Sequence, residues 1–443
     1  MATGSAFARL AAMTLTLFEM AALVLSVTAA ASWVNAMTLK LPVAVGLLVV
    51  GLGLTVVVVL CEALPPLRDV GAVYRRLEGQ IDFPALVLNF MLAYLLFAGA
   101  MNVNLAALAR RGWAVAALAT LGTVLSTGLI AGAFWGLCRL VGLDMPVSWA
   151  LVFGALISPT DPIAVLAMTR RTDLEPDLQA QLEGEALFND GVAVVLFKAL
   201  LAYAIGQSAG SGGHTDIAAL CGHAMIEAFG GIGLGLVAAL LAGLILHAVN
   251  DWITETLITV ATATVVYAAA LHFGLSGPLG VVAAGLVMAS PWAKRSLSAH
   301  SREYIHPFWH VIDEGMNAVL FLLVGVTAIA LHLDLRALAL LIGGPVMVLA
   351  CRWITVALMG SALPLFRRKA SLKLYNVLTW AGVRGGLSIA MVLLLPEGPE
   401  RQAIFAAALG VVIFSIVVQS MTMEKLALRT GYGSPRKDAE PTY

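Results

Sequence analysis

The sequence predicts an all-α, polytopic membrane protein with about 13 transmembrane helices. Its composition is the first observation, because 60% of the 443 residues are apolar and only 12% are charged. Soluble domains carry about 25% charged residues. The second observation is that the apolar residues form continuous runs of about twenty, the length that an α-helix needs to cross a bilayer. These features exclude an ordinary soluble protein and leave no room for a large soluble domain.

Polar residues, Gly and Pro separate the apolar runs and define the order of the expected spans. From the N-terminus, the spans are 13–34, 41–62, 83–106, 113–141, 146–168, 180–205, 217–247, 252–272, 275–290, 307–331, 337–364, 372–395 and 401–422. They form one integral membrane domain over 1–443, with repeats at about 13–205 and 252–422 that the span 217–247 links. Residues 423–443 are a short cytoplasmic tail.

Positive charges predict the orientation of the spans, since cytoplasmic loops of membrane proteins are enriched in Lys and Arg. Sixteen Lys and Arg residues lie on the side of the C-terminal tail and seven on the opposite side. The loop that contains Arg75 and Arg76 departs from this rule. We therefore expect a cytoplasmic C-terminus, an N-terminus outside, and a location in the plasma membrane, which in a bacterium is the inner membrane.

Two spans contain interruptions near their middle. The span 146–168 contains Ser-Pro-Thr-Asp-Pro at 158–162, and the span 372–395 contains Gly-Val-Arg-Gly-Gly at 382–386. Broken helices are tolerated within a membrane only where protein or a water-filled cavity satisfies the freed backbone groups. The two spans occupy equivalent places in the two repeats and run in opposite directions. We expect them to cross as parts of inverted repeats, the arrangement that marks the binding site of a secondary transporter.

Charged residues in the middle of a span are costly and need a partner or a function. Asp161, Glu185, Asp190 and Arg384 are the central candidates, and they leave a local excess of two negative charges. The simplest balance pairs Glu185 with Arg384 as a buried structural ion pair. Asp161 and Asp190 then repel each other, so their site favours either a monovalent cation or a proton, which is the chemistry of an antiporter.

Other roles for these charges remain open at this point. They could only neutralise each other and the ends of the interrupted helices, where partial charges of opposite sign meet. A cation channel is an alternative function, although a channel would favour rings of like charge or symmetric filter motifs. An intramembrane aspartyl enzyme that uses Asp161 and Asp190 is a further alternative. Lys and Arg equal Asp and Glu at 26 each, so no net charge favours a nucleic-acid partner.

Three motifs together resemble the monovalent cation/proton antiporter family, which includes bacterial NhaP-type sodium/proton antiporters and animal sodium/hydrogen exchangers. They are the two interrupted segments, 158–162 and 382–386, and Gly-Glu-x-x-x-Asn-Asp-Gly at 184–191. The resemblance implies a secondary active transporter rather than an enzyme. It also implies a homodimer, with elevator-like alternating access between a core domain and a dimerisation domain.

The resemblance also assigns roles to individual residues. It implies that Asp190 carries the exchanged ion, that Asp161 assists, and that Glu185 and Arg384 are structural. We expect the cation and proton site to comprise Asp190, Asp161, Thr160 and Asn189, with the monovalent cation at Asp161 and Asp190. The Asn189-Asp190 pair, in place of two Asp residues, resembles the electroneutral branch of the family. The expected partners are sodium or potassium ions, protons and the lipid bilayer, the expected role is pH homeostasis, and no cofactor is expected.

Overall fold

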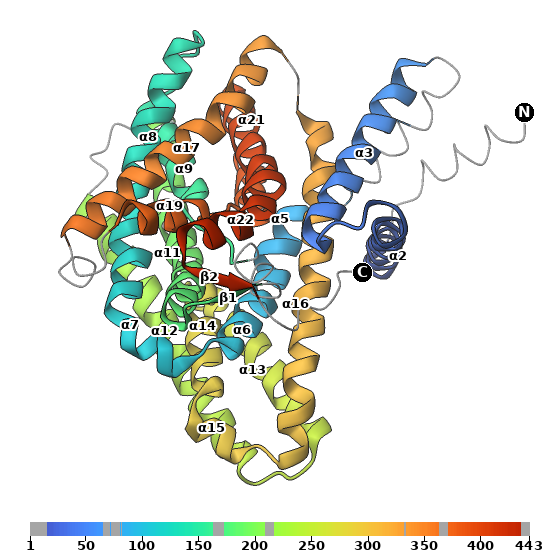
Figure 1. Cartoon of the computed structure of the whole chain (residues 1–443), viewed down its shortest axis with the longest axis vertical. Helices are drawn as coiled ribbons and strands as arrows, with labels where there is room; N and C mark the ends of the chain where they lie inside the picture. Colours follow the sequence, from blue (N-terminus) through green and yellow to red (C-terminus); the bar gives the residue numbers. More distant parts are fainter. Residues whose placement is uncertain are drawn as a thin grey trace, which may run out of the picture.

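The computed structural model describes residues 16–64, 71, 80, 82–162, 172–208, 217–331, 334–362 and 371–435. Nearly all of these residues are helical, and the helices pack side by side (Figure 1). Ten helices in the described ranges are long and apolar enough to cross a membrane. The prediction of an all-α, polytopic membrane protein is therefore confirmed. Arg75, Arg76 and the end of the predicted tail, 436–443, lie outside the described residues.

The N-terminal half consists of long helices, several of which contain one π-helical turn. In order, it comprises α2 (Leu17–Val34) with η1 (Asn35–Leu39), α3 (Val43–Ala63), α5 (Phe83–Leu86) with η3 (Val87–Met91) and α6 (Leu92–Asn102), α7 (Leu105–Ala117) with η4 (Leu118–Gly122) and α8 (Thr123–Leu140), α9 (Val147–Ile157), and α11 (Pro176–Ser208). The predicted span 83–106 thus lies within a few residues of the observed run Phe83–Asn102, whereas the span 113–141 ends with α8 but begins eight residues after the start of α7 at Leu105.

The C-terminal half begins with α12 (Ile217–Leu246) and is also built of helices. The helices that follow are α13 (Trp252–His272), α14 (Gly277–Ala289), α15 (Pro291–Ser296), α16 (Ala299–Thr327) with η5 (Ala328–Ala330), α17 (Leu335–Ala362), α19 (Leu372–Trp380), α20 (Gly386–Leu393), and α21 (Pro399–Phe414) with η6 (Ser415–Gln419) and α22 (Ser420–Thr430).

Two short strands were not expected from the sequence. Strand β1 (Thr172–Leu174) precedes α11, and β2 (Gly433–Pro435) follows α22. They pair antiparallel, with Asp173 opposite Ser434. The start of the motif helix α11 and the end of the described chain are therefore joined by a backbone ladder (Figure 1).

The second predicted interruption is confirmed, and the first begins where the sequence predicts it. Helix α9 ends at Ile157, directly before the segment with two prolines, which cannot continue a helical hydrogen-bond pattern. Helix α19 ends at Trp380, and α20 begins at Gly386 after five residues without helical structure. The second half of the span 146–168 falls largely in 163–171, outside the described residues.

The two interruptions contact each other, which brings distant parts of the sequence together. The backbone N–H of Asp161 donates a hydrogen bond of 2.7 Å to the carbonyl of Val383. The aromatic pair Phe134 and Phe153, with ring centroids 4.0 Å apart, holds α9 against α8. Both rings are fully buried, so the packed interior fixes the direction from which α9 reaches the contact.

Candidate functional site

Helix α11 carries the motif residues of the predicted site. Glu185 and Asn189 are four residues apart on one face of this helix, and both side chains are buried. Asp190 lies about 100° further around the helix and is partly exposed. Gly184 permits the close packing of α11 on α7, since a side chain there would collide with Leu108. Glu185 and Asn189 therefore lie on a buried face of α11, whereas the side chain of Asp190 is partly exposed.

Asn189 connects α11 to the first interruption. Its Nδ2 donates a hydrogen bond of 2.7 Å to Thr160 Oγ1, and the Thr160 backbone N–H donates to Asn189 Oδ1 at 3.4 Å. Both residues are buried, at 2% and 4% exposure. The structure thus brings these two sequence-predicted site residues together, and their mutual bonds hold the extended segment against α11.

The prediction that Glu185 pairs with Arg384 is wrong, because a different arginine pairs with Glu185. Glu185 Oε1 instead lies 2.5 Å from Nη2 of Arg352, which projects from α17. Both partners are buried, with side-chain exposures of 2% and 6%. A buried carboxylate without a countercharge is costly, and Arg352 supplies that charge where α17 passes the site. Arg352 is the residue that sequence reasoning missed, although an arginine inside the apolar span 337–364 itself called for a partner.

Arg384 bonds to backbone instead of to a carboxylate. Its Nη1 donates to the carbonyl oxygens of Ser158 and, at 2.6 Å, of Pro159. These carbonyls follow the last turn of α9, where the partial negative charge of the helix dipole is concentrated. Arg384 therefore neutralises the C-terminal end of the interrupted helix, while Glu185, Asp190 and Arg352 lie within its electrostatic range.

Asp161 lies at the opposite kind of helix end. A Cβ atom placed on Gly385, the residue that precedes α20, would lie 1.9 Å from Asp161 Oδ2. The carboxylate thus approaches the N-terminal end of α20, where the helix dipole is positive. Each interruption thus supplies a charge to a helix end of the other. Arg384, from the second, lies at the C-terminal end of α9, and Asp161, from the first, lies at the N-terminal end of α20.

Replacing Gly385 by Ala is expected to displace the Asp161 carboxylate and to lower transport about tenfold or more. Overpacking of this kind costs about 1–3 kcal/mol, and about 1.4 kcal/mol corresponds to a factor of ten. The measurement is cation-driven proton movement in proteoliposomes. Gly233→Ala on α12 is the matched control, because nothing lies within 4 Å of a Cβ there. Equal rates for the two variants would show that the close approach of Asp161 to Gly385 has no functional weight.

Asp190 differs from the other charged groups of the site. Within the described ranges, its carboxylate forms no hydrogen bond and no ion pair, and it interacts electrostatically with Asp161 and Arg384. No group of three or more His, Cys, Asp or Glu residues that could hold a metal ion occurs in the described part of the chain. A cation at this position would therefore rely on one or two carboxylates supplemented by hydroxyl, amide or water oxygens.

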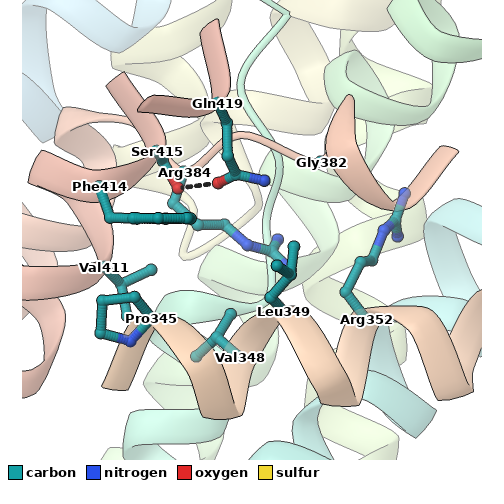
Figure 2. A pocket seen from close by; sticks show the side chains of 10 residues that line it. All are labelled: Pro345, Val348, Leu349, Arg352, Gly382, Arg384, Val411, Phe414, Ser415 and Gln419. Carbon is teal, nitrogen blue, oxygen red and sulfur yellow. Dashed lines mark hydrogen bonds between the residues drawn. The ribbon is translucent and has the colours of Figure 1, made fainter. Parts of the chain in front are cut away.

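A small cavity of about 10 Å³ borders the two arginines, with space comparable to one water molecule (Figure 2). Ser415 and Gln419, from the π-helical turn η6, line it and share a hydrogen bond of 2.6 Å. Gln419 Nε2 also donates to the carbonyl of Trp380 at 3.3 Å, at the end of α19. Ser415 and Gln419 thus supply polar side chains to the same small cavity that Arg352 and Arg384 line.

Comparison with known proteins identifies the family of the chain. The family model described as "Sodium/hydrogen exchanger, transmembrane" matches residues 23–429. The chain belongs to this family. The resemblance inferred from the three motifs is therefore confirmed, and the family is one of transporters rather than enzymes.

Similar proteins cover nearly the whole chain. The Na(+)/H(+) antiporter NhaP of Pseudomonas aeruginosa is 32% identical over 431 residues, which are 96% of this chain and 99% of that protein. The Na(+)/H(+) antiporter NhaH of Halobacillus dabanensis is 31% identical over 89% of this chain and 93% of its own length. The solved structure of the sodium proton antiporter MjNhaP1 from Methanocaldococcus jannaschii matches with a TM-score of 0.68 at 19% identity, covering 92% of this chain and 97% of that one. This last likeness supports the fold.

Proposed function

We propose that the chain is an electroneutral antiporter that exchanges one sodium or potassium ion for one proton at Asp190. The charge balance of the site carries this proposal. Asp161, Glu185 and Asp190 face Arg352 and Arg384, so the predicted excess of two negative charges becomes an excess of one. A single monovalent cation or a single proton neutralises that excess. Because both ions compensate the same charge, their binding is mutually exclusive.

Asp190 is the residue at which the two ions compete. It is the motif carboxylate that is partly exposed and lacks a protein partner among the described residues. Asp161 assists by adding negative potential to the site and by placing its carboxylate near the positive N-terminal end of α20. Thr160 and Asn189 keep the interrupted segment at the distance at which their oxygens can supplement the carboxylates.

Transport then occurs by alternating access at this shared site. The two interruptions lie in spans at equivalent places of the proposed inverted repeats, 13–205 and 252–422. In this proposal the protein works as a homodimer in the bacterial inner membrane, with its C-terminus in the cytoplasm and its N-terminus outside, and contributes to pH homeostasis. It needs no cofactor beyond the transported ions.

A cation channel remains the second candidate, because a partly exposed carboxylate could also line a pore. The paired charges favour the antiporter, since a single charge that one ion neutralises suits exclusive occupancy better than continuous conduction. An aspartyl enzyme is set aside by membership of an exchanger family.

The proposal is tested in proteoliposomes that carry an imposed pH gradient. Adding sodium or potassium is expected to dissipate the gradient, and the sodium-driven rate is expected to stay the same when potassium and valinomycin set the membrane potential. Each net charge moved would contribute about 2.3 kcal/mol per 100 mV, a large effect on the driving force. A rate that depends strongly on potential would refute electroneutrality. Cation flux without proton movement would favour the channel.

A further inference from the structure

A second cavity borders a different face of α17 from the small cavity at the two arginines, and Leu349 lines both. It has a volume of about 660 Å³ and lies between α17, α19 and α22. Small-molecule sites typically have volumes of about 300–1,000 Å³. These helices pack on one another in the structure, so the groove is formed by neighbouring elements (Figure 1).

The walls of the groove are mainly apolar. Val346, Leu349 and the rings of Trp353 and Trp380 line it. The indole N–H of Trp353 donates to Asn376 Oδ1 at 3.2 Å, and that of Trp380 donates to Thr422 Oγ1 at 2.9 Å. Because the protein already satisfies both polar ring atoms, the indoles offer their apolar faces to an occupant.

One end of the groove is strongly basic. Lys425 and Arg429 are four residues apart on one face of α22, and both line the groove and are exposed. In the part of the chain that the structure describes, neither forms an ion pair. Two cations next to an apolar groove are complementary to a molecule that combines a negative head with an apolar body.

The apolar walls continue onto a face of α17 that is exposed in the isolated chain. Val346 is 70% exposed and Trp353 is 39% exposed. The direction from Val346 to Trp353 leads toward the end of α17 at Ala362. The next described segment begins at Ser371, whose hydroxyl lies 3.3 Å from that of Tyr432, just after α22. In the proposed orientation this is the cytoplasmic side. The inner leaflet of a membrane is rich in anionic lipids, and basic pockets between helices on this side suit their head groups.

We propose that this groove binds one anionic phospholipid of the cytoplasmic leaflet. The phosphate head group contacts Lys425 and Arg429, and an acyl chain lies along Val346, Leu349 and Trp353. The site is separate from the ion site, because neither Lys425 nor Arg429 takes part in the charge balance around Asp190.

The test uses the purified full chain in detergent, titrated with phosphatidylglycerol or phosphatidylcholine while its melting temperature is measured. Phosphatidylglycerol is expected to stabilise the protein more than phosphatidylcholine does. The double substitution Lys425→Gln and Arg429→Gln is expected to lower the apparent affinity for phosphatidylglycerol about 30-fold, from the attraction that two basic residues supply. The double substitution Lys294→Gln and Arg295→Gln is the matched control, because these two exposed cations lie on α15, away from the groove. It is expected to leave the affinity unchanged.

A second variant fills the groove without altering its charge. Ala350 lines the groove and is exposed, so Ala350→Trp is expected to keep the fold while it displaces the acyl chain. Loss of the phosphatidylglycerol effect in this variant supports the proposal. An unchanged effect in Ala350→Trp, or equal losses in the two double variants, would overturn it, since the lipid would then bind only to a charged surface. Equal stabilisation by soluble glycerol 3-phosphate would also overturn it, because a free phosphate would suffice.

Discussion

Replacing Asp190 by Asn is expected to abolish cation/proton exchange while the protein remains folded. Asn keeps the size and polarity of the side chain but removes both the negative charge and the titratable proton. The site would then hold two carboxylates against two guanidinium groups, and no excess charge would remain to attract a cation. Sodium-induced dissipation of a pH gradient in proteoliposomes should fall to the level of protein-free vesicles.

The control for this prediction is the same chemical change at a carboxylate outside the site. Asp251 precedes α13, and its side chain accepts hydrogen bonds from the backbone N–H and hydroxyl of Thr254. These bonds hold its pKa below the ordinary value, and an Asn there can still cap the helix. Asp251→Asn should therefore transport normally. Exchange that persists in folded Asp190→Asn protein would remove Asp190 from the mechanism.

Replacing Arg352 by Leu is expected to destabilise the protein by about 3–5 kcal/mol, the cost of leaving one member of a buried ion pair without its partner. Arg384 cannot take its place, because its Nη1 is bonded to the carbonyls at the end of α9. Glu185→Leu should have a similar effect. The double substitution Glu185→Leu and Arg352→Leu should lose much less than the two single changes combined, since it leaves no uncompensated charge.

The measurement is the loss of folded protein on heating in detergent, compared across the two single variants and the double variant. If the destabilisation of the double variant equals the sum of the two single destabilisations, the 2.5 Å contact carries no coupling energy between the two residues. A folded, stable Arg352→Leu protein that is altered only in cation affinity would contradict the structural role and would place Arg352 in the ion pathway.

The sequence predicts well those features that depend on one segment at a time. Continuous apolar runs predict the helices, because their length must match the bilayer. Pro159 and Pro162, and Gly385 and Gly386, predict where helices are interrupted, because these residues act on their own backbone. The spacing of Glu185 and Asn189 likewise predicts a shared face, since the helical period is constant.

The contacts between distant segments were harder to predict. The partner of Glu185 depends on how α17 packs beside α11, and no spacing along either helix reveals that arrangement. Arg384 was favoured because it lies in an interruption, whereas Arg352 lies in an unbroken apolar run. If each arginine within a span is treated as a group that needs a countercharge, Arg352 and Arg384 are both candidate partners of Glu185.

The two short strands were missed because three residues are too few to show an alternating pattern, and because the two paired segments lie far apart in the sequence. They have a mechanical meaning. The ladder fastens the segment that follows α22 to the residues that immediately precede α11, the helix on which Asp190 lies. We therefore expect a displacement of α11 during a transport cycle to carry residues 433–435 with it. A fluorescent label attached there would move with the ion-carrying helix and could report each cycle from outside the ion site.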